Sequence, residues 1–452
     1  MSKMMHALRV RRILFAPIVL LTLFLLPQMA GATEIQKVIS PAGIEVWLIE
    51  DHSVPVISLA FGWKGGTAVE PSGKEGVTML ASGLMDEGAG DIDSAAFQQK
   101  IADLGLDYSF DASADDFSGH LRTLTENKDQ AADLLALALT KPRFDEEPVE
   151  RMRRHFLIAI EGEMRDPGSA ANRVLEKKLL GDHPYARSNY GTKESMSALN
   201  ADDLRNFVKD RLTRDHLYVA AAGDINATDL GRLVDRAFAG LPAKGAPIDV
   251  PEGKATDKGS LWVLERDIPQ ATVLFAQNGI KRSDKDFFAA YLMNYVLGGG
   301  GFSSRLMTEV REKRGLSYGI NTDLATLDHA GLITGSYETP NDKVAETLGL
   351  VRKEWRRMAE EGPTATELDD ARTYLLGYYP RNLTTSSKAA DTLLGIQMNH
   401  LGFDYVERRR KEIEAVTIDD VKRVAKALLD EKALTIVVAG KPGDLPGAQK
   451  VQ

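Results

Sequence analysis

The sequence predicts an α+β protein of two similar domains that arose by internal duplication, each a mostly antiparallel sheet with helices packed on one side. Three observations indicate this architecture. A helix–loop–strand pattern occurs twice, a linker-like segment lies between the copies, and in each half the strand patterns precede most of the helical ones. Strands that are grouped, rather than alternating with helices, favour an α+β fold over a doubly wound parallel sheet.

The duplication is clearest where residues 199–224 align with residues 416–441 at an offset of 217. Each copy has an Asp-Asp pair, an amphipathic helix, a short loop and an apolar strand that reaches a glycine. The starts of the halves match more loosely, through VWLIE at 46–50 and LWVLE at 261–265. Similar segments in the same order predict two related domains.

The first 32 residues have the pattern of a signal peptide. A basic start is followed by a 14-residue apolar run from Ile13 to Leu26, and Ala30-Gly31-Ala32 supplies the small residues of a cleavage site. An uncleaved anchor is the less favoured alternative, because the run is short for a membrane span. We therefore expect a periplasmic or secreted protein with no membrane attachment after cleavage.

The remaining chain divides at a segment of linker composition. Residues 33–242 form the predicted N-terminal domain, residues 243–257 the linker, and residues 258–452 the C-terminal domain. The linker region is rich in Pro, Gly and Ala and has no helical period. Helical patterns occupy 76–86, 93–104, 126–140, 146–165 and 168–180 in the first half, and 284–297, 303–313, 341–361, 364–376 and 386–400 in the second.

Composition excludes several classes of function. The chain has 65 acidic and 56 basic residues, and no Lys/Arg block beyond its first dozen residues suggests a phosphate-binding face, so we expect no nucleic-acid partner. The absence of cysteine excludes disulfides, cysteine-ligated zinc and thiol nucleophiles. Eight histidines are present, but no two lie within a helical turn of each other, so the usual local signature of hydrolytic zinc is missing.

One local group of residues has chemical potential: RLMTEVREKRGLSYGI, residues 305–320. The pattern predicts a basic helix that stops at Gly315 and a strand that resumes over 316–320. It places a guanidinium and a phenol near one helix end, where both can donate hydrogen bonds to a substrate carbonyl or carboxylate. A solvated basic helix end that interacts with the helix dipole explains the same spacing, and both interpretations stay open at this point.

Six segments in a fixed order carry a family resemblance. They are FGWKGGTAVEPSGKEGVTMLASGLMDEGAG (61–90), LGLDYSFDASADDFSG (104–119), LTKPRFDEEPVERMRR (139–154), EGEMRDPGS (161–169), HPYARSNYGT (183–192) and YVLGGGGFSSRLMTEVREKRGLSYGI (295–320). With them, nearly the whole chain after the signal peptide resembles the pitrilysin/insulinase family of zinc metallopeptidases. The resemblance is to its short, heterodimer-forming subunits, and it implies two peptidase-like domains.

The zinc motif of the family is degenerate in this chain. Active members read Gly-Leu-Ala-His-x-x-Glu-His from the position of Gly76; here Met79, Ser82 and Gly83 stand where the His, Glu and His would be. An acid remains near the third ligand position, either Glu161 or Glu163. By resemblance, this chain alone has no catalytic residues and binds no metal, and zinc is expected in a partner subunit.

The resemblance also assigns a role to Arg311 and Tyr318. In heterodimeric members the non-zinc subunit supplies an Arg/Tyr pair, seven residues apart, that binds the peptide substrate near the bond to be cleaved. We therefore expect the non-zinc subunit of a heterodimeric metallopeptidase, inactive alone and active with a zinc-bearing partner of the same family. The alternative is a catalytically inactive structural or peptide-holding subunit, and an independent peptidase with unusual ligands is the least favoured.

Overall fold

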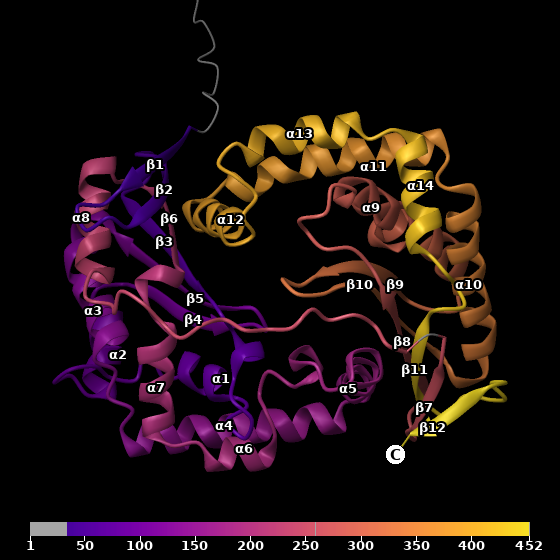
Figure 1. Cartoon of the computed structure of the whole chain (residues 1–452), viewed down its shortest axis with the longest axis horizontal. Helices are drawn as coiled ribbons and strands as arrows, with labels where there is room; N and C mark the ends of the chain where they lie inside the picture. Colours follow the sequence, from indigo (N-terminus) through magenta and orange to yellow (C-terminus); the bar gives the residue numbers. More distant parts are fainter. Residues whose placement is uncertain (1–33, 258, 452) are drawn as a thin grey trace, which may run out of the picture. The chain divides into compact units, whose positions relative to one another are not determined.

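Two six-stranded sheets form the framework of the computed structural model, which describes residues 34–257 and 259–451 (Figure 1). The predicted signal peptide lies outside the described residues. The first sheet contains β1 (Ile35–Ile39), β2 (Glu45–Glu50), β3 (Val56–Lys64), β4 (Asp107–Ala112), β5 (Asp116–Leu124) and β6 (Leu217–Gly223). The second contains β7 (Leu261–Glu265), β8 (Gln270–Asn278), β9 (Ile320–Thr326), β10 (Gly331–Pro340), β11 (Thr435–Gly440) and β12 (Ala448–Val451).

The two sheets share one strand order, which confirms the predicted α+β fold of two similar, duplicated halves. Their orders are β1-β2-β6-β3-β5-β4 and β12-β7-β11-β8-β10-β9. In each, the second and third strands pair in parallel, and the third, fourth, fifth and sixth pair antiparallel. Only the first position differs, because β1 runs antiparallel to β2 whereas β12 runs parallel to β7.

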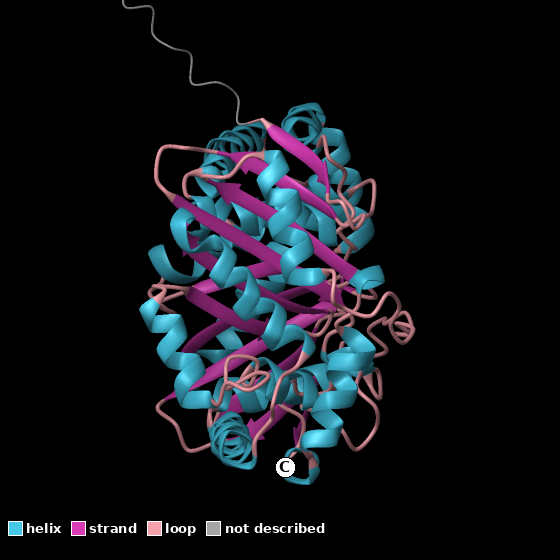
Figure 2. Cartoon of the chain, turned by 90° about the vertical axis from the view of Figure 1, so that its left-hand side faces the viewer, coloured by secondary structure: helices cyan, strands magenta, loops and turns pink. Residues whose placement is uncertain are grey.

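Helices follow the strands in both halves, close to the predicted ranges. The first half contains α1 (Val77–Ser82), α2 (Ser94–Asp103), α3 (Lys128–Thr140), α4 (Glu146–Arg165), α5 (Pro167–Leu180), α6 (Lys193–Ala198), α7 (Ala201–Arg211) and α8 (Ala227–Phe238). The second contains α9 (Phe287–Asn294), α10 (Val344–Glu361), α11 (Ala365–Tyr378), α12 (Ser386–Met398), α13 (Tyr405–Ala415) and α14 (Ile418–Leu428). Figure 2, viewed from the side of the first sheet, shows helices lying across its strands.

Short helical turns connect the longer helices and the strands. Two are π-helical, η5 (Tyr295–Gly299) and η7 (Met307–Glu312). The 3₁₀ turns are η1 (Thr67–Val69), η2 (Thr125–Asn127), η3 (Pro184–Ala186), η4 (Arg214–His216), η6 (Gly301–Ser303), η8 (Asn341–Lys343) and η9 (Tyr379–Leu383). None of the helices among the described residues has the length and apolarity needed to cross a membrane.

The repeated Asp-Asp pair has a local structural reason. Asp203 and Asp420 are the third residues of α7 and α14, and each accepts a hydrogen bond from the backbone N–H of the residue that caps its helix, Asn200 or Thr417, at 3.0 Å. The cap side chains in turn accept from the two aspartate N–H groups, which completes a capping box. This arrangement satisfies N–H groups that the first helical turn would otherwise leave unpaired.

The halves exchange one helix each. α5 of the first half packs on β8 and β11 of the second sheet, and α12 of the second half packs on β2, β3 and β6 of the first. Both helices follow equivalent long helices in the two halves, as the offset of 217 requires. The exchange covers the sheet face that the other helices of a half leave open, which explains why β3 is buried along nearly its whole length. Gln397 joins the two parts by donating to the Val219 carbonyl at 2.9 Å.

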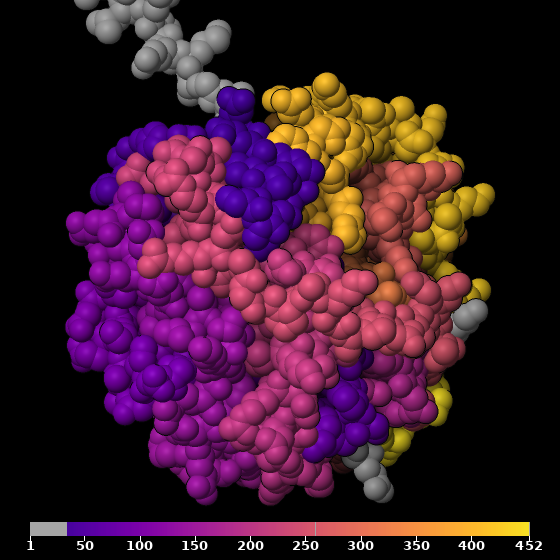
Figure 3. Space-filling view, turned by 60° about the vertical axis from the view of Figure 1, so that its left-hand side comes forward, coloured from indigo at the N-terminus to yellow at the C-terminus, as the bar shows by residue number. Residues whose placement is uncertain are grey.

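The predicted linker contains no helix or strand over residues 243–257. It runs along the surface from the first sheet to the second (Figures 1 and 3). Its N–H groups at Gly253 and Thr256 donate to the carbonyls of His329 and Leu179, from different halves. Because such contacts join residues 35–452 into one compact unit, the domain limits given above stay a prediction.

Candidate functional site

A cavity of about 1320 Å³ lies where elements of both halves meet. On one side it is lined by α4, α5 and residues 184–190, and on the other by β8, β10 and the start of β9. Three of the residues singled out in the sequence line it: Met79, Glu163 and Tyr318. The structure therefore brings the degenerate zinc segment and the tyrosine of the Arg/Tyr pair to a common cavity within this chain.

The wall of the cavity is held by a polar contact between the halves. The Lys64 ammonium, with a side chain only 12% exposed, pairs with Asp116 at 2.9 Å and with Asp328 at 2.7 Å. Asp328 lies in the turn between β9 and β10, and its N–H donates to Asp115 at 3.0 Å. The next N–H, of His329, donates to the Tyr185 hydroxyl at 3.1 Å. This cluster fixes the β9–β10 turn, and with it the cavity wall, against the first half.

The degenerate zinc positions do not fit a metal. Ser82 is buried and donates to the Met79 carbonyl at 2.8 Å, so its hydroxyl is used within the helix. A side chain at Gly83 would meet the sulfur of Met152 at 2.8 Å from its first carbon, which leaves no room for a histidine without repacking. Within residues 34–257 and 259–451, no group of three His, Cys, Asp or Glu side chains is arranged to hold a metal ion. α1 is thus a packing helix at this point.

The structure distinguishes the two candidate acids. Glu161 pairs with Arg165 at 3.4 Å and with Lys193 at 3.7 Å and is not among the residues that line the cavity. Glu163 lines the cavity and accepts a hydrogen bond from the Ser188 hydroxyl at 3.0 Å. Glu163 is therefore the acid that remains in the cavity, a distinction that spacing along the sequence left open.

A second carboxyl in the cavity was not predicted from the sequence. Glu176 on α5 lines the cavity, and its burial, with a smaller contribution from the charge of Glu163, raises its pKa to about 7; the hydrogen bond from Asn172 and the charge of Arg173 oppose this. In the sequence, Glu176 is recognisable only as an acid four residues after Asn172, next to the apolar face of an amphipathic helix. That pattern occurs on most surface helices, so it could not have identified the residue.

The start of α1 depends on a further acid, Glu70, which is buried. Its carboxylate is 7% exposed and accepts from the N–H groups of Gly76 and Thr78, both at 2.8 Å. Gly76 has a left-handed backbone with φ 92°, and a side chain there would lie 2.4 Å from the Tyr190 carbonyl oxygen. Burial raises the pKa of Glu70 to about 7, although both hydrogen bonds act to lower it.

Glu70→Gln is expected to change how stability depends on pH. The pKa of Glu70 is about 7 in the folded chain and 4.5 in the unfolded chain. Between pH 4.5 and 7 the folded state therefore binds more protons than the unfolded state, and the free energy of unfolding falls as pH rises through this range. The variant should lose this part of the slope, about 3 kcal/mol over the interval. Urea unfolding followed by circular dichroism from pH 4.5 to 7.5 measures it. Glu126→Gln, at an exposed glutamate, is the control, and parallel curves for Glu70→Gln and wild type would contradict the assignment.

The segment that carries Arg311 and Tyr318 differs in part from the prediction. Its helix is π-helical, with the Lys313 N–H donating to the Thr308 carbonyl, and it ends in a turn at Gly315, whose φ is 62°. Strand β9 begins only at Ile320, so residues 316–319 form a loop rather than the predicted start of the strand. The reason is local: the Ser317 hydroxyl bonds the carbonyl and N–H of Gly319 and turns the backbone. π-helical turns are frequent at functional sites.

Tyr318 and Arg311 occupy different environments. Tyr318 is 84% exposed and lines the cavity from this loop. Arg311 is not among the lining residues; its guanidinium lies over the ring of Phe302, 4.5 Å from the centroid. Phe302 follows Gly301, which does line the cavity, so Arg311 lies next to the cavity wall rather than in it.

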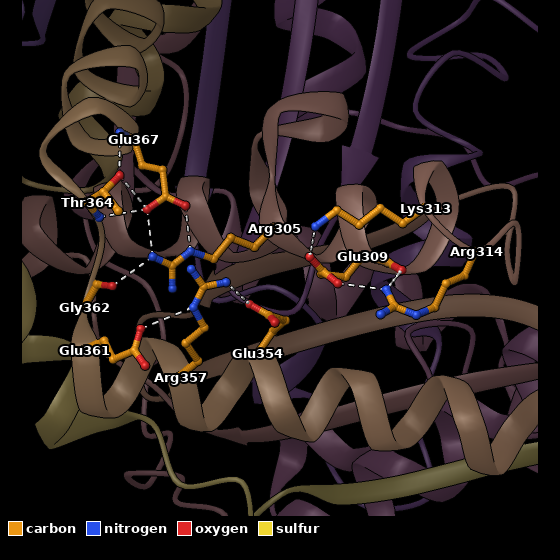
Figure 4. A network of polar contacts seen from close by, with 10 residues as sticks. All are labelled: Arg305, Glu309, Lys313, Arg314, Glu354, Arg357, Glu361, Gly362, Thr364 and Glu367. Atoms are coloured by element: carbon orange, nitrogen blue, oxygen red, sulfur yellow. Dashed lines mark hydrogen bonds and ion pairs between the residues drawn. The ribbon is translucent and has the colours of Figure 1, made fainter.

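The other basic residues of this segment, Arg305, Lys313 and Arg314, form ion pairs with carboxylates (Figure 4). Arg305, 6% exposed, makes a two-pronged contact with Glu367, both at 2.7 Å, and donates to the Gly362 carbonyl at 2.9 Å. Lys313 and Arg314 both pair with Glu309. Among the described residues no carboxylate forms an ion pair with Arg311, so pairing with Glu309 accounts for Lys313 and Arg314 but not for Arg311.

Comparison with known proteins shows which family the chain resembles. Residues 198–375 match the family model described as "Peptidase M16 inactive domain". The solved structure of a peptidase M16 inactive domain from Pseudomonas fluorescens covers 93% of this chain, and 100% of its own length is matched, with a TM-score of 0.85 and 28% identity. The chain resembles the peptidase M16 family in both sequence and fold. This confirms the resemblance to the pitrilysin/insulinase metallopeptidases.

Curated M16 relatives carry two kinds of name. A Helicobacter pylori protein named "Non-peptidase homolog YmxG" is 28% identical over 413 residues, covering 90% of this chain and 94% of the relative. An uncharacterized zinc protease of Streptomyces coelicolor is also 28% identical, over 424 residues and 90% of each chain. A protease structure from Helicobacter pylori shares the fold, with a TM-score of 0.82 at 18% identity. The match to an inactive-domain model and a non-peptidase homolog supports an inactive family member.

Proposed function

We propose that this M16 chain is the non-zinc, substrate-binding subunit of a heterodimeric zinc peptidase that cleaves peptides in the periplasm or outside the cell. The observation that carries the proposal is a contrast between two segments that meet at one cavity. Met79, Ser82 and Gly83 occupy the zinc motif, whereas Tyr318 stays exposed at the cavity and the Arg311 guanidinium has no carboxylate among the described residues. A subunit that only supported its partner would have no need of both donors.

The chemistry of these donors suits the carbonyl side of peptide hydrolysis. Zinc held by the partner would supply the activated water. The Tyr318 hydroxyl can donate a hydrogen bond to the substrate carbonyl oxygen as negative charge develops on it, and Arg311 can hold the substrate backbone beside it. No step in this scheme uses a metal on this chain.

Two open sheet edges support binding of an extended peptide. β4 and β9 are the outermost strands of their sheets, and residues of both, Asp111 and Ala112 on β4 and Ile320 and Asn321 on β9, line the cavity. An edge strand presents unpaired N–H and C=O groups to which a peptide can add as a further strand. The same edges would serve the second candidate, a catalytically inactive peptide-holding subunit, which the non-peptidase relative favours.

The function is tested by hydrolysis of a quenched fluorescent peptide by this chain alone, by a zinc-bearing family member alone, and by their mixture. We expect turnover mainly from the mixture, with both proteins eluting together on gel filtration. Co-elution without a gain in turnover would favour the peptide-holding alternative. Turnover by this chain alone that a chelator abolishes would overturn the proposal.

We expect the purified chain to contain no stoichiometric zinc. The reason is that Ser82 is hydrogen-bonded within its helix and that Gly83 has no side chain, so among the positions of the family's zinc site only Glu163 offers a carboxylate to the cavity. One carboxylate does not hold a catalytic zinc ion. Elemental analysis after dialysis against trace zinc measures the content. One zinc per chain that disappears in Glu163→Gln but not in Glu161→Gln would show that the remaining acid is a ligand after all.

A further inference from the structure

A second cavity, of about 850 Å³, lies in the C-terminal half and has no part in the peptide chemistry proposed above. It is bounded by the start of α9, by α13, by the turn after α12 and by the β9–β10 turn. Its wall combines aromatic rings with charged groups, among them Arg282, Phe287, Phe288, Tyr405 and Arg408.

Arg282 is the unusual residue of this cavity. Its guanidinium lies 3.8 Å from the centre of the Phe287 ring, and the rings of Phe288 and Tyr405 are 5.3 and 5.2 Å away. One of its N–H groups donates to the Tyr405 hydroxyl. Rings on several sides hold the guanidinium plane in one orientation, which leaves its remaining N–H groups preorganised as donors.

Three neighbouring cations pair with carboxylates, whereas Arg282 does not. Arg408 pairs with Glu412 at 2.6 Å, Arg423 with Asp286 at 2.7 Å, and Lys281 with Glu252. Over residues 34–257 and 259–451, no carboxylate forms an ion pair with Arg282. A half-buried guanidinium that lacks an anion is costly, because its charge is partly removed from water without compensation.

We propose that this cavity binds a carboxylate attached to an apolar group. The carboxylate would accept the free N–H groups of Arg282, and the apolar group would lie against Phe287 and Phe288. A singly charged carboxylate fits better than a phosphate, since Asp284, Asp286 and Glu412 also line the cavity and would repel a second negative charge. A free organic acid and the C-terminal residue of a peptide share this chemistry.

Isothermal titration calorimetry with defined probes tests the site. The probes are 3-phenylpropionate and its amide, and an acetylated tripeptide ending in phenylalanine with a free or an amidated C-terminus. We expect saturable binding of an acid and about 10-fold to 100-fold weaker binding of the matching amide, the usual worth of a hydrogen bond to a charged group. Binding of the organic acid, of the peptide, or of both identifies the source of the carboxylate.

Variants connect the binding to Arg282. Arg282→Gln should weaken binding of the acid probe by a similar factor. Arg282→Lys should weaken this binding less, because the charge stays although the planar guanidinium is lost. Arg410→Gln is the matched control: it removes the same charge from α13, and Arg410 does not line the cavity. If circular dichroism shows that Arg282→Gln does not fold, binding of the acid probe is measured with Arg282→Lys and Tyr405→Phe instead. Each of these variants should bind the acid more weakly than the wild-type chain does. No saturable binding to the wild-type chain, equal binding of acid and amide, or unchanged binding in the folded variants would overturn the proposal.

Discussion

Arg305→Met is expected to lower the free energy of unfolding by about 3–5 kcal/mol, the usual cost of removing one partner of a buried ion pair. Arg305 is buried and holds the start of the segment that carries Arg311 and Tyr318 against Glu367 of α11 and the Gly362 carbonyl (Figure 4). Its removal leaves that carbonyl and a half-buried carboxylate without their donor. Chemical unfolding at neutral pH, followed by circular dichroism, measures the loss.

Acid dependence provides a second test of the same contact. Burial alone would raise the pKa of Glu367, but hydrogen bonds from Arg305 and Thr364 outweigh it and lower the pKa to about 2. This stabilisation is present above the unfolded value of 4.5 and is lost as pH falls toward 2. The gap in stability between wild type and Arg305→Met should therefore narrow in acid. Lys313→Gln, which removes an exposed partner of Glu309, should cost no more than about 1 kcal/mol. Equal losses in the two variants would rule out an anchoring role for Arg305.

Tyr318→Phe and Arg311→Ala are expected to reduce turnover by the proposed heterodimer by about 10²–10³, the usual effect of losing one donor to a developing oxyanion. Tyr318→Phe should mainly lower kcat, because the hydroxyl acts as charge develops. Arg311→Ala should also raise KM, because the guanidinium holds the substrate before the reaction. Steady-state hydrolysis of a quenched peptide, with the zinc-bearing partner in excess, separates the two parameters.

Because Tyr318 is highly exposed, its replacement should affect catalysis without affecting folding. A side chain that is 84% exposed contributes little to packing, so its loss should leave folding and partner binding intact. Arg314→Ala is the control within the same segment, because Arg314 is paired with Glu309. Wild-type kcat/KM in both donor variants would remove the catalytic role and leave the peptide-holding subunit as the better account.

The sequence by itself determined the duplicated α+β fold and most helix positions. The predicted 146–165 coincides with α4, and 168–180 and 386–400 lie within two residues of α5 and α12 at each end. These features are local: a helix follows from apolar spacing and from caps such as Asn200 and Thr417, which act within one turn. The loop before β9 was missed because a single serine side chain, Ser317, turns the backbone there.

Only the tertiary structure decided which side chains share a cavity. The exchange of α5 and α12 between the halves placed Glu176 opposite β8 and β10, and the rotation of α4 turned Glu163 rather than Glu161 into the cavity. It also left Arg282 among aromatic rings without an anion, 123 positions from Tyr405 along the chain. Periodicity specifies a helix and its apolar face, but the neighbour that covers that face comes from contacts between residues hundreds of positions apart. Such contacts depend on how whole surfaces fit together, and no local pattern records them.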